Sequence, residues 1–118
     1  MIRNILFYIQ FIPATIIACS LAVLAGLLQK SGTLANKIGR VWGAQVLRMA
    51  GVRLEVQLGD LDPNKAYVFM VNHQSMLDIP VTMAALGDYK FGFVAKESLY
   101  DIPLFGQALY RAGHISID

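Results

Sequence analysis

The amino-acid sequence predicts an α/β fold in which a membrane-associated helical hairpin precedes a small, mostly parallel sheet with crossover helices. Two observations predict this class. The first is a stretch of 26 uncharged residues at positions 4–29, which is long enough for a membrane helix. The second is a series of short apolar runs after residue 51, rich in strand formers and separated by segments that suit helices.

Composition divides the chain into a membrane-facing part and a water-facing part. Of the 118 residues, enough for one small domain, 56% are hydrophobic and 15% are charged. Residues 1–54 hold six of the ten lysines and arginines and none of the eight acidic residues. We therefore expect membrane-anchoring helices at 1–50 and the N-terminal part of an α/β domain at 51–118. The single cysteine, Cys19, excludes an intramolecular disulfide.

The uncharged segment Asn4–Gln29 predicts the first helix. As a helix it would measure ~39 Å, against ~30 Å for a hydrocarbon core. It is long enough to cross a bilayer, and a helix inserted into one leaflet remains an alternative. Pro13 predicts a kink in its first half. If the helix spans, Lys30, Lys37 and Arg40 place its C-terminal side in the cytoplasm.

Leu34–Ala50 predicts a second helix, and Gly51 is suited to end it. One face of this helix is apolar, and the opposite arc is basic. The apolar face consists of Ala35, Ile38, Trp42, Val46 and Met49. The basic arc consists of Lys37, Arg40 and Arg48. Two interpretations stay open: a helix lying in the membrane interface, or a helix packed on the domain with its charges in water.

The first predicted strand is Val52–Leu58, which alternates strictly between apolar and polar residues. Residues 59–65 supply turn chemistry. A second strand is expected at Tyr67–Val71, followed by a polar turn and a helix that ends near Leu86-Gly87. Pro80 is compatible with that helix because it falls in or near the first turn.

The second half of the predicted sheet begins with a strand at Phe91–Ala95. Residues 66–95 then form a strand-helix-strand unit, long enough for a right-handed parallel crossover. A further helix is expected around Leu104–Arg111, ending at Gly113, and a last short strand at Ile115–Ile117.

The polar turn Asn72-His73-Gln74-Ser75 is the candidate site, because open α/β sheets place their chemistry where a strand ends and a helix begins. Asp78 follows His73 by five positions. With the helix beginning between them, the chain can fold the carboxylate back onto the imidazole, an arrangement that suits a general base held in one tautomer. Alternatively, Asp78 caps the helix, since Ser75-x-x-Asp78 resembles a capping box, and His73 is an ordinary loop residue.

Residues 72–78 are similar to the Asn-His-x-Ser-x-x-Asp block of the glycerolipid acyltransferases, represented by the bacterial 1-acylglycerol-3-phosphate acyltransferases. Further blocks follow in the family's order: Phe93-Val94-Ala95-Lys96-Glu97-Ser98-Leu99, Ile102-Pro103-Leu104-Phe105-Gly106 and Gly113-His114-Ile115-Ser116-Ile117-Asp118. The resemblance covers residues 66–118 in detail and the hydrophobic N-terminus more loosely.

The resemblance implies acyl transfer from acyl-CoA or acyl carrier protein to 1-acylglycerol 3-phosphate, forming phosphatidic acid without a cofactor. His73 would be the general base and Asp78 its orienting partner. Lys96 is the candidate contact for the phosphate or the carrier, because it is the basic residue at the end of the strand expected beside the strand that leads to His73, with a solvated surface lysine as the alternative. Asn72 and Ser75 would shape the turn. The lipid acceptor implies a place at the bacterial inner membrane, on its cytoplasmic face.

The sequence departs from the family pattern at its end. The second block usually continues into an arginine after the position of Asp118, and a later Pro-Glu-Gly-Thr-type loop is absent. We therefore expect a truncated α/β fold with little or no activity by itself. Rival hypotheses are an acyltransferase for another lysolipid or glycerol 3-phosphate, and a non-catalytic membrane-binding fragment. The sequence has no cluster of metal ligands and no basic-aromatic stripe for nucleic acid.

Overall fold

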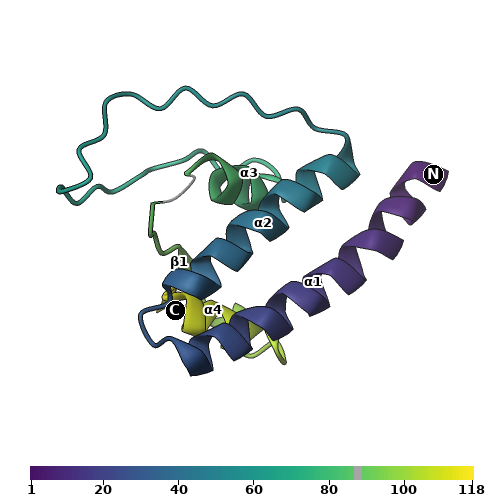
Figure 1. Ribbon diagram of the computed structural model, residues 1–118. Helices are drawn as coiled ribbons and strands as arrows, with labels where there is room; N and C mark the ends of the chain where they lie inside the picture. Colours follow the sequence, from purple (N-terminus) through teal and green to yellow (C-terminus); the bar gives the residue numbers. More distant parts are fainter. Residues whose placement is uncertain (87–88) are drawn as a thin grey trace.

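A helical hairpin dominates the computed structural model, which describes residues 1–86 and 89–118. Helix α1 spans Ile2–Leu28 and helix α2 spans Thr33–Ala50. The chain reverses between them through Gly32, whose φ of 75° lies in the left-handed region that glycine adopts without strain. Both helices predicted for the first half of the chain are therefore confirmed (Figure 1).

Helix α1 is long and apolar enough to cross a membrane, by length and composition. A signal sequence or a core helix of a soluble protein can meet the same criterion. Most of its large side chains are exposed, among them Ile9, Ile12, Ile16, Ile17 and Leu24. Its other side holds a core built from small side chains of α1, α2 and α4: Cys19, Ala22, Ala25, Ala35, Ala108 and Ala112. Small residues let the helices approach closely, so α1 is packed on one side and uncovered on the other.

Helix α2 is the central element, because it packs against α1, α3 and α4. Ala35 and Val46, from its predicted apolar face, are buried. Trp42 faces α1, where its Nε1–H donates to Oγ1 of Thr15 at 3.0 Å and its ring lies 6.2 Å from that of Phe11. This part of the apolar face is packed against protein. Gly51 ends the helix with a φ of 72°, as expected for a glycine C-cap.

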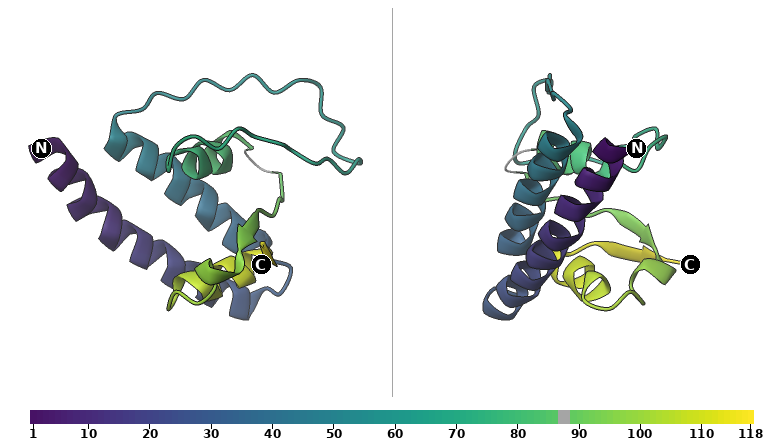
Figure 2. Two further views of the ribbon diagram at one scale, coloured as in Figure 1. Left: turned by 180° about the vertical axis from the view of Figure 1, so that it is seen from behind. Right: turned by 90° about the vertical axis from the view of Figure 1, so that its right-hand side faces the viewer.

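The C-terminal part contains a small parallel sheet. Strand β1 (Val94–Lys96) is followed by the short 3₁₀ helix η1 (Glu97–Leu99), helix α4 (Phe105–Ala112) and strand β2 (Ile115–Ile117). The strands pair in parallel from Val94 opposite Ile115 to Lys96 opposite Ile117. Figure 2 shows the strands and α4 on one side of the α1–α2 hairpin. The last helix and strand were predicted within a residue or two, and β1 begins three residues later than expected.

The predicted strands Val52–Leu58 and Tyr67–Val71 are wrong. Both segments are extended but pair with no other strand among residues 1–86 and 89–118, and they form the long excursion above the helices in Figure 1. The predicted crossover over residues 66–95 is wrong for the same reason, and the parallel pair is β1 with β2. A strand needs a neighbour that accepts its backbone hydrogen bonds and a surface that covers its side chains. Val68 and Met70 have neither cover nor partner: they are 91% and 94% exposed.

Helix α3 (Asp78–Ala85) is the predicted helix after the polar turn, with Pro80 as its third residue. The expected end near Leu86-Gly87 falls partly outside the described residues, since Gly87 is not among them. A short turn at Leu77 joins α3 to the turn that carries His73. Because α3 packs against α2 and begins at Asp78, this packing holds Asp78 next to the turn that carries His73.

The α2–α3 contact depends on Gly43, and a matched pair of substitutions tests this. An added Cβ at Gly43 would lie 2.7 Å from the Pro80 carbonyl oxygen, whereas one at Gly39 would lie 3.4 Å from the flexible end of Met83. We expect Gly43→Ala to lower the free energy of unfolding by about 1–3 kcal/mol. Gly39→Ala should raise it by up to about 1 kcal/mol through helix propensity. Urea unfolding in mild detergent measures both, and equal effects of the two changes would contradict close packing at Gly43.

Candidate active site

The turn that precedes α3 is organised around one carboxylate oxygen. Oδ2 of Asp78 accepts hydrogen bonds from the backbone N–H groups of Gln74 at 2.6 Å and Ser75 at 2.8 Å. The Ser75 hydroxyl in turn accepts from the Leu77 N–H at 3.1 Å. A side chain that reaches back to an N–H ahead of its own helix is the reciprocal half of a capping box. Helix α3 itself has Leu77 as its N-cap and no side-chain cap hydrogen bond. Asp78 therefore places a charge in the first turn and fastens the turn ahead of the helix, but it does not cap the helix.

The same carboxylate oxygen also faces the imidazole. Nδ1 of His73 lies 3.3 Å from Oδ2 of Asp78, and the two side chains are 68% and 28% exposed. An imidazole nitrogen that faces a carboxylate carries the proton, so Nε2 is left with a lone pair. The structure thus brings together the two residues that the sequence singled out. One carboxylate oxygen both fastens the turn and faces the imidazole, so the structural contact and the contact with His73 are not alternatives.

The turn keeps Asp78 ionised. The backbone N–H groups of Ser75 and Gln74, followed by the neighbouring His73, hold the pKa of the Asp78 carboxyl below its ordinary value. An anion beside Nδ1 favours the tautomer with the proton on that nitrogen and stabilises the ring when it becomes an imidazolium. This arrangement can hold a proton acceptor, Nε2 of His73, open to a ligand arriving from solvent.

Among the described residues, the other predicted site residues make no hydrogen bond or ion pair with the His73 imidazole. Asn72 and Ser75 lie in the turn beside His73, and the Ser75 hydroxyl has the turn-shaping bond described above. Lys96 is exposed at the C-terminal end of β1, and it makes no hydrogen bond or ion pair with His73 or Asp78 in the described part of the chain. Lys96 was proposed because its strand was expected beside a strand ending at Val71. Since that strand does not form, the reason for placing Lys96 next to His73 is lost.

Two buried polar residues that were not assigned to the site fasten the segment leading into β1. Nδ2 of Asn36 donates to the Phe91 carbonyl at 2.7 Å, and Nδ1 of His114 accepts from the Phe93 N–H at 2.9 Å. The Ile115 N–H donates to the Phe93 carbonyl at 2.7 Å, which continues the β1–β2 ladder. For Asn36, the only feature of the sequence that could have indicated this contact was its position next to the apolar face of a predicted helix. These contacts join positions 55 and 21 residues apart.

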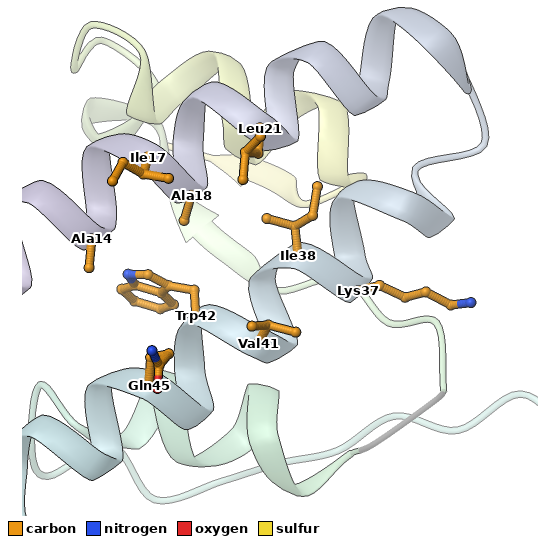
Figure 3. A pocket seen from close by; sticks show the side chains of 9 residues that line it. All are labelled: Ala14, Ile17, Ala18, Leu21, Lys37, Ile38, Val41, Trp42 and Gln45. Carbon is orange, nitrogen blue, oxygen red and sulfur yellow. The ribbon is translucent and has the colours of Figure 1, made fainter.

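An apolar groove of about 420 Å³ lies between α1 and α2, and Figure 3 shows its lining side chains. Its walls consist of Ala14, Ile17, Ala18 and Leu21 from α1 and Lys37, Ile38, Val41, Trp42 and Gln45 from α2. Helix α3 instead packs over Gly39 and Gly43 of α2. The groove and the His73–Asp78 pair therefore lie on different faces of α2.

Among the described residues, no group of three or more His, Cys, Asp or Glu side chains is placed to hold a metal ion. The candidate site is an exposed imidazole with a carboxylate behind it. Such a pair can accept a proton from a hydroxyl group while that group attacks an electrophile.

Comparison with known proteins gives a family match over the second half of the chain. The model of the family described as Acyltransferase matches residues 53–118. A 1-acyl-sn-glycerol-3-phosphate acyltransferase of Helicobacter pylori strain J99 is 39% identical over 70 residues, which are 59% of this chain and 28% of that protein. One from Chlamydomonas reinhardtii is 36% identical over 56 residues, 48% of this chain and 16% of that protein. The chain thus spans less than a third of either relative, and no solved structure matches it.

Proposed function

The chain belongs to the acyltransferase family, and from this premise we propose that the protein containing it acylates 1-acylglycerol 3-phosphate to phosphatidic acid. The match confirms the family resemblance that the sequence motifs indicated. The choice of acceptor is supported by the names of the two relatives. The acyl donor in this proposal is acyl-CoA or acyl carrier protein. The observation that carries the proposal is the 3.3 Å approach of His73 Nδ1 to Asp78 Oδ2 in the matched region.

In the proposed reaction His73 is the general base. Its Nε2 takes the proton of the acceptor hydroxyl as the hydroxyl oxygen attacks the thioester carbonyl carbon. The new C–O bond forms, the C–S bond breaks, and the thiolate leaves with the proton that the imidazolium returns. An alcohol is a weak nucleophile at neutral pH, so it requires this assistance as it attacks.

Asp78 has the supporting role in this proposal. Its carboxylate would keep the Nδ1 proton in place and stabilise the imidazolium while His73 holds the transferred proton. The two backbone N–H groups that bind Oδ2 prevent the carboxylate from turning away. Lys96, an exposed residue at the end of β1, remains proposed as a contact for the acceptor phosphate or for the carrier of the acyl group.

The proposed place of the reaction is a membrane surface, since the acceptor is a lipid. The long apolar helix α1, with large side chains exposed along it, supports membrane association. We propose the cytoplasmic face of a bacterial inner membrane, where a soluble thioester carrier can reach the site and the basic residues after α1 would face the cytoplasm. In this proposal α1 anchors the domain, and the exposed His73 faces the aqueous side.

The proposal is tested by an acyl-transfer assay of the protein containing this chain, in detergent-lipid micelles with palmitoyl-CoA. We expect phosphatidic acid from 1-acylglycerol 3-phosphate, with saturation in both substrates. Glycerol 3-phosphate, lysophosphatidylcholine and lysophosphatidylethanolamine are offered in parallel. Preference for one of these would move the acceptor assignment to that compound. Vesicle binding without turnover on any acceptor would instead support a membrane-binding role.

A further inference from the structure

Helix α3 packs on α2 (Figure 1) where α2 carries two glycines one turn apart, Gly39 and Gly43. Gly43 is buried against the backbone of α3. A Cβ added there would lie 2.7 Å from the Pro80 carbonyl oxygen, 3.1 Å from Cβ of Met83 and 3.4 Å from Cα of Pro80. The nearest atoms to a Cβ at Gly39 are Cε and Sδ of Met83, at 3.4 and 3.6 Å. Gly43 therefore permits a backbone contact with α3, whereas Gly39 faces the end of a flexible side chain.

Helix α2 has less freedom to move at this contact than α3. It packs against α1 and α4 as well, and Trp42, the residue before Gly43, donates to Oγ1 of Thr15 on α1 at 3.0 Å. Helix α3 has only eight residues, and its main contact in the described part of the chain is with α2. A helix this short is marginal by itself in water, so it depends on packing. A side chain at position 43 would therefore displace or loosen α3 and leave α2 in place.

Asp78 joins α3 to the turn that carries His73. It is the first residue of the helix, and Pro80 is the third. The Asp78 N–H donates to the Ser75 carbonyl at 3.1 Å. Its Oδ2 accepts from the N–H groups of Gln74 and Ser75 and faces Nδ1 of His73. The hydrogen bonds that order the turn are thus made by a residue two positions away from the Pro80 contact.

The chain ahead of this turn gives it no comparable support. Residues 66–71 pair with no strand in the part of the chain that the structure describes, and Val68 and Met70 are almost fully exposed. The order of the turn therefore depends on Asp78. Because Asp78 belongs to α3, its position depends in turn on the contact between α3 and α2.

We propose that Gly43 is a positioning residue for the His73–Asp78 pair. By letting the backbone of α3 lie directly on α2, it keeps Asp78 where its carboxylate holds both the turn and the imidazole. Its importance for catalysis rests on the proposed function of His73 as general base. The nearest atoms to position 43 belong to Pro80 and Met83, so its effect on the pair passes through α3. A misplacement of about 1 Å in a catalytic group can cost about 10²-fold in rate.

The kinetic test uses Gly43→Ala in the protein containing this chain, with Gly39→Ala as the matched control. We expect Gly43→Ala to lower kcat for phosphatidic acid formation by about 3- to 30-fold with little change in KM, and Gly39→Ala to keep kcat within about 2-fold. In a His73→Ala background, Gly43→Ala should cause no further loss, because the group that it misplaces is absent. The same fold-loss in both backgrounds would show a general structural effect and overturn the proposal.

Met83→Ala approaches the same contact from α3 without adding an atom to α2. It removes the side chain that packs over both glycines, so it should lower kcat in the same way and only when His73 is present. Urea unfolding checks that each variant is folded. If Gly43→Ala fails to fold, Met83→Ala decides: a normal kcat in this variant would overturn the proposal.

Hydrogen exchange tests the proposal without turnover. NMR in detergent micelles follows the amide protons of Gln74 and Ser75, which bind Oδ2 of Asp78. Gly43→Ala should speed their exchange about 5-fold or more, and Gly39→Ala should not, because local opening follows the loss of local packing. Unchanged exchange in Gly43→Ala would overturn the proposal even in an active acyltransferase. Faster exchange in a protein that forms no phosphatidic acid would support the positioning role and refute the acyl-transfer function alone.

Discussion

Replacing His73 by alanine should lower the rate of acyl transfer by about 10²- to 10⁴-fold in the protein containing this chain, the usual contribution of a general base. The imidazole is 68% exposed and its Nδ1 is turned toward Asp78, so Nε2 is the atom available to the acceptor hydroxyl. Steady-state assays with acyl-CoA and 1-acylglycerol 3-phosphate measure the loss. It should appear mainly in kcat, because the proton transfer is made only in the transition state.

Gln74 provides the matched control. It is exposed beside His73, and it contributes its backbone N–H, not its side chain, to Asp78. Gln74→Ala should therefore keep the activity within about 3-fold. Asp78→Asn should lower kcat as well, because the neutral amide cannot stabilise the imidazolium. Full activity of His73→Ala would remove the imidazole from the mechanism and favour the purely structural interpretation of the turn.

Acid should destabilise the fold through His114. Burial lowers the pKa of its imidazole from 6.5 to about 4, and its Nδ1 accepts the Phe93 N–H, a bond that only the neutral ring can make. Between these two pKa values the unfolded chain binds more protons than the native chain, so stability falls as the pH falls from about 6.5 to about 4. A shift of this size corresponds to at most about 3 kcal/mol in the free energy of unfolding.

His114→Gln separates this effect from the loss of packing. The glutamine carbonyl oxygen is able to accept the Phe93 N–H, but the side chain does not titrate. We expect the variant to be somewhat less stable at pH 7 and to lose most of the decline in stability between about pH 6.5 and 4. Asp78 does not interfere, because a carboxyl with a lowered pKa loses its stabilisation below about pH 4. An unchanged pH profile in His114→Gln would assign the acid sensitivity to another group.

The His73–Asp78 contact was predictable from the sequence because it is local. Five positions and one helix start separate the residues, and a helix that begins between them leaves few ways to arrange the two side chains. The place of Lys96 was not predictable in the same way. It depended on which strands are neighbours, and a pattern within one strand does not contain that information. The same limit applies to His114 and Asn36, whose partners lie 21 and 55 residues away.

The sequence by itself determined the helices and the motif-bearing turn. An uncharged run, a two-faced helix and glycines at the helix ends are local signals, and the backbone hydrogen bonds of a helix are satisfied within the segment. Only the tertiary structure decided which extended segments became strands. The two strands that formed, Val94–Lys96 and Ile115–Ile117, pair in parallel and are connected through α4. Better strand patterns occur at Val52–Leu58 and Tyr67–Val71, but these segments pair with no strand in the described part of the chain. A strand is stabilised by its neighbour, so its own residues cannot establish it.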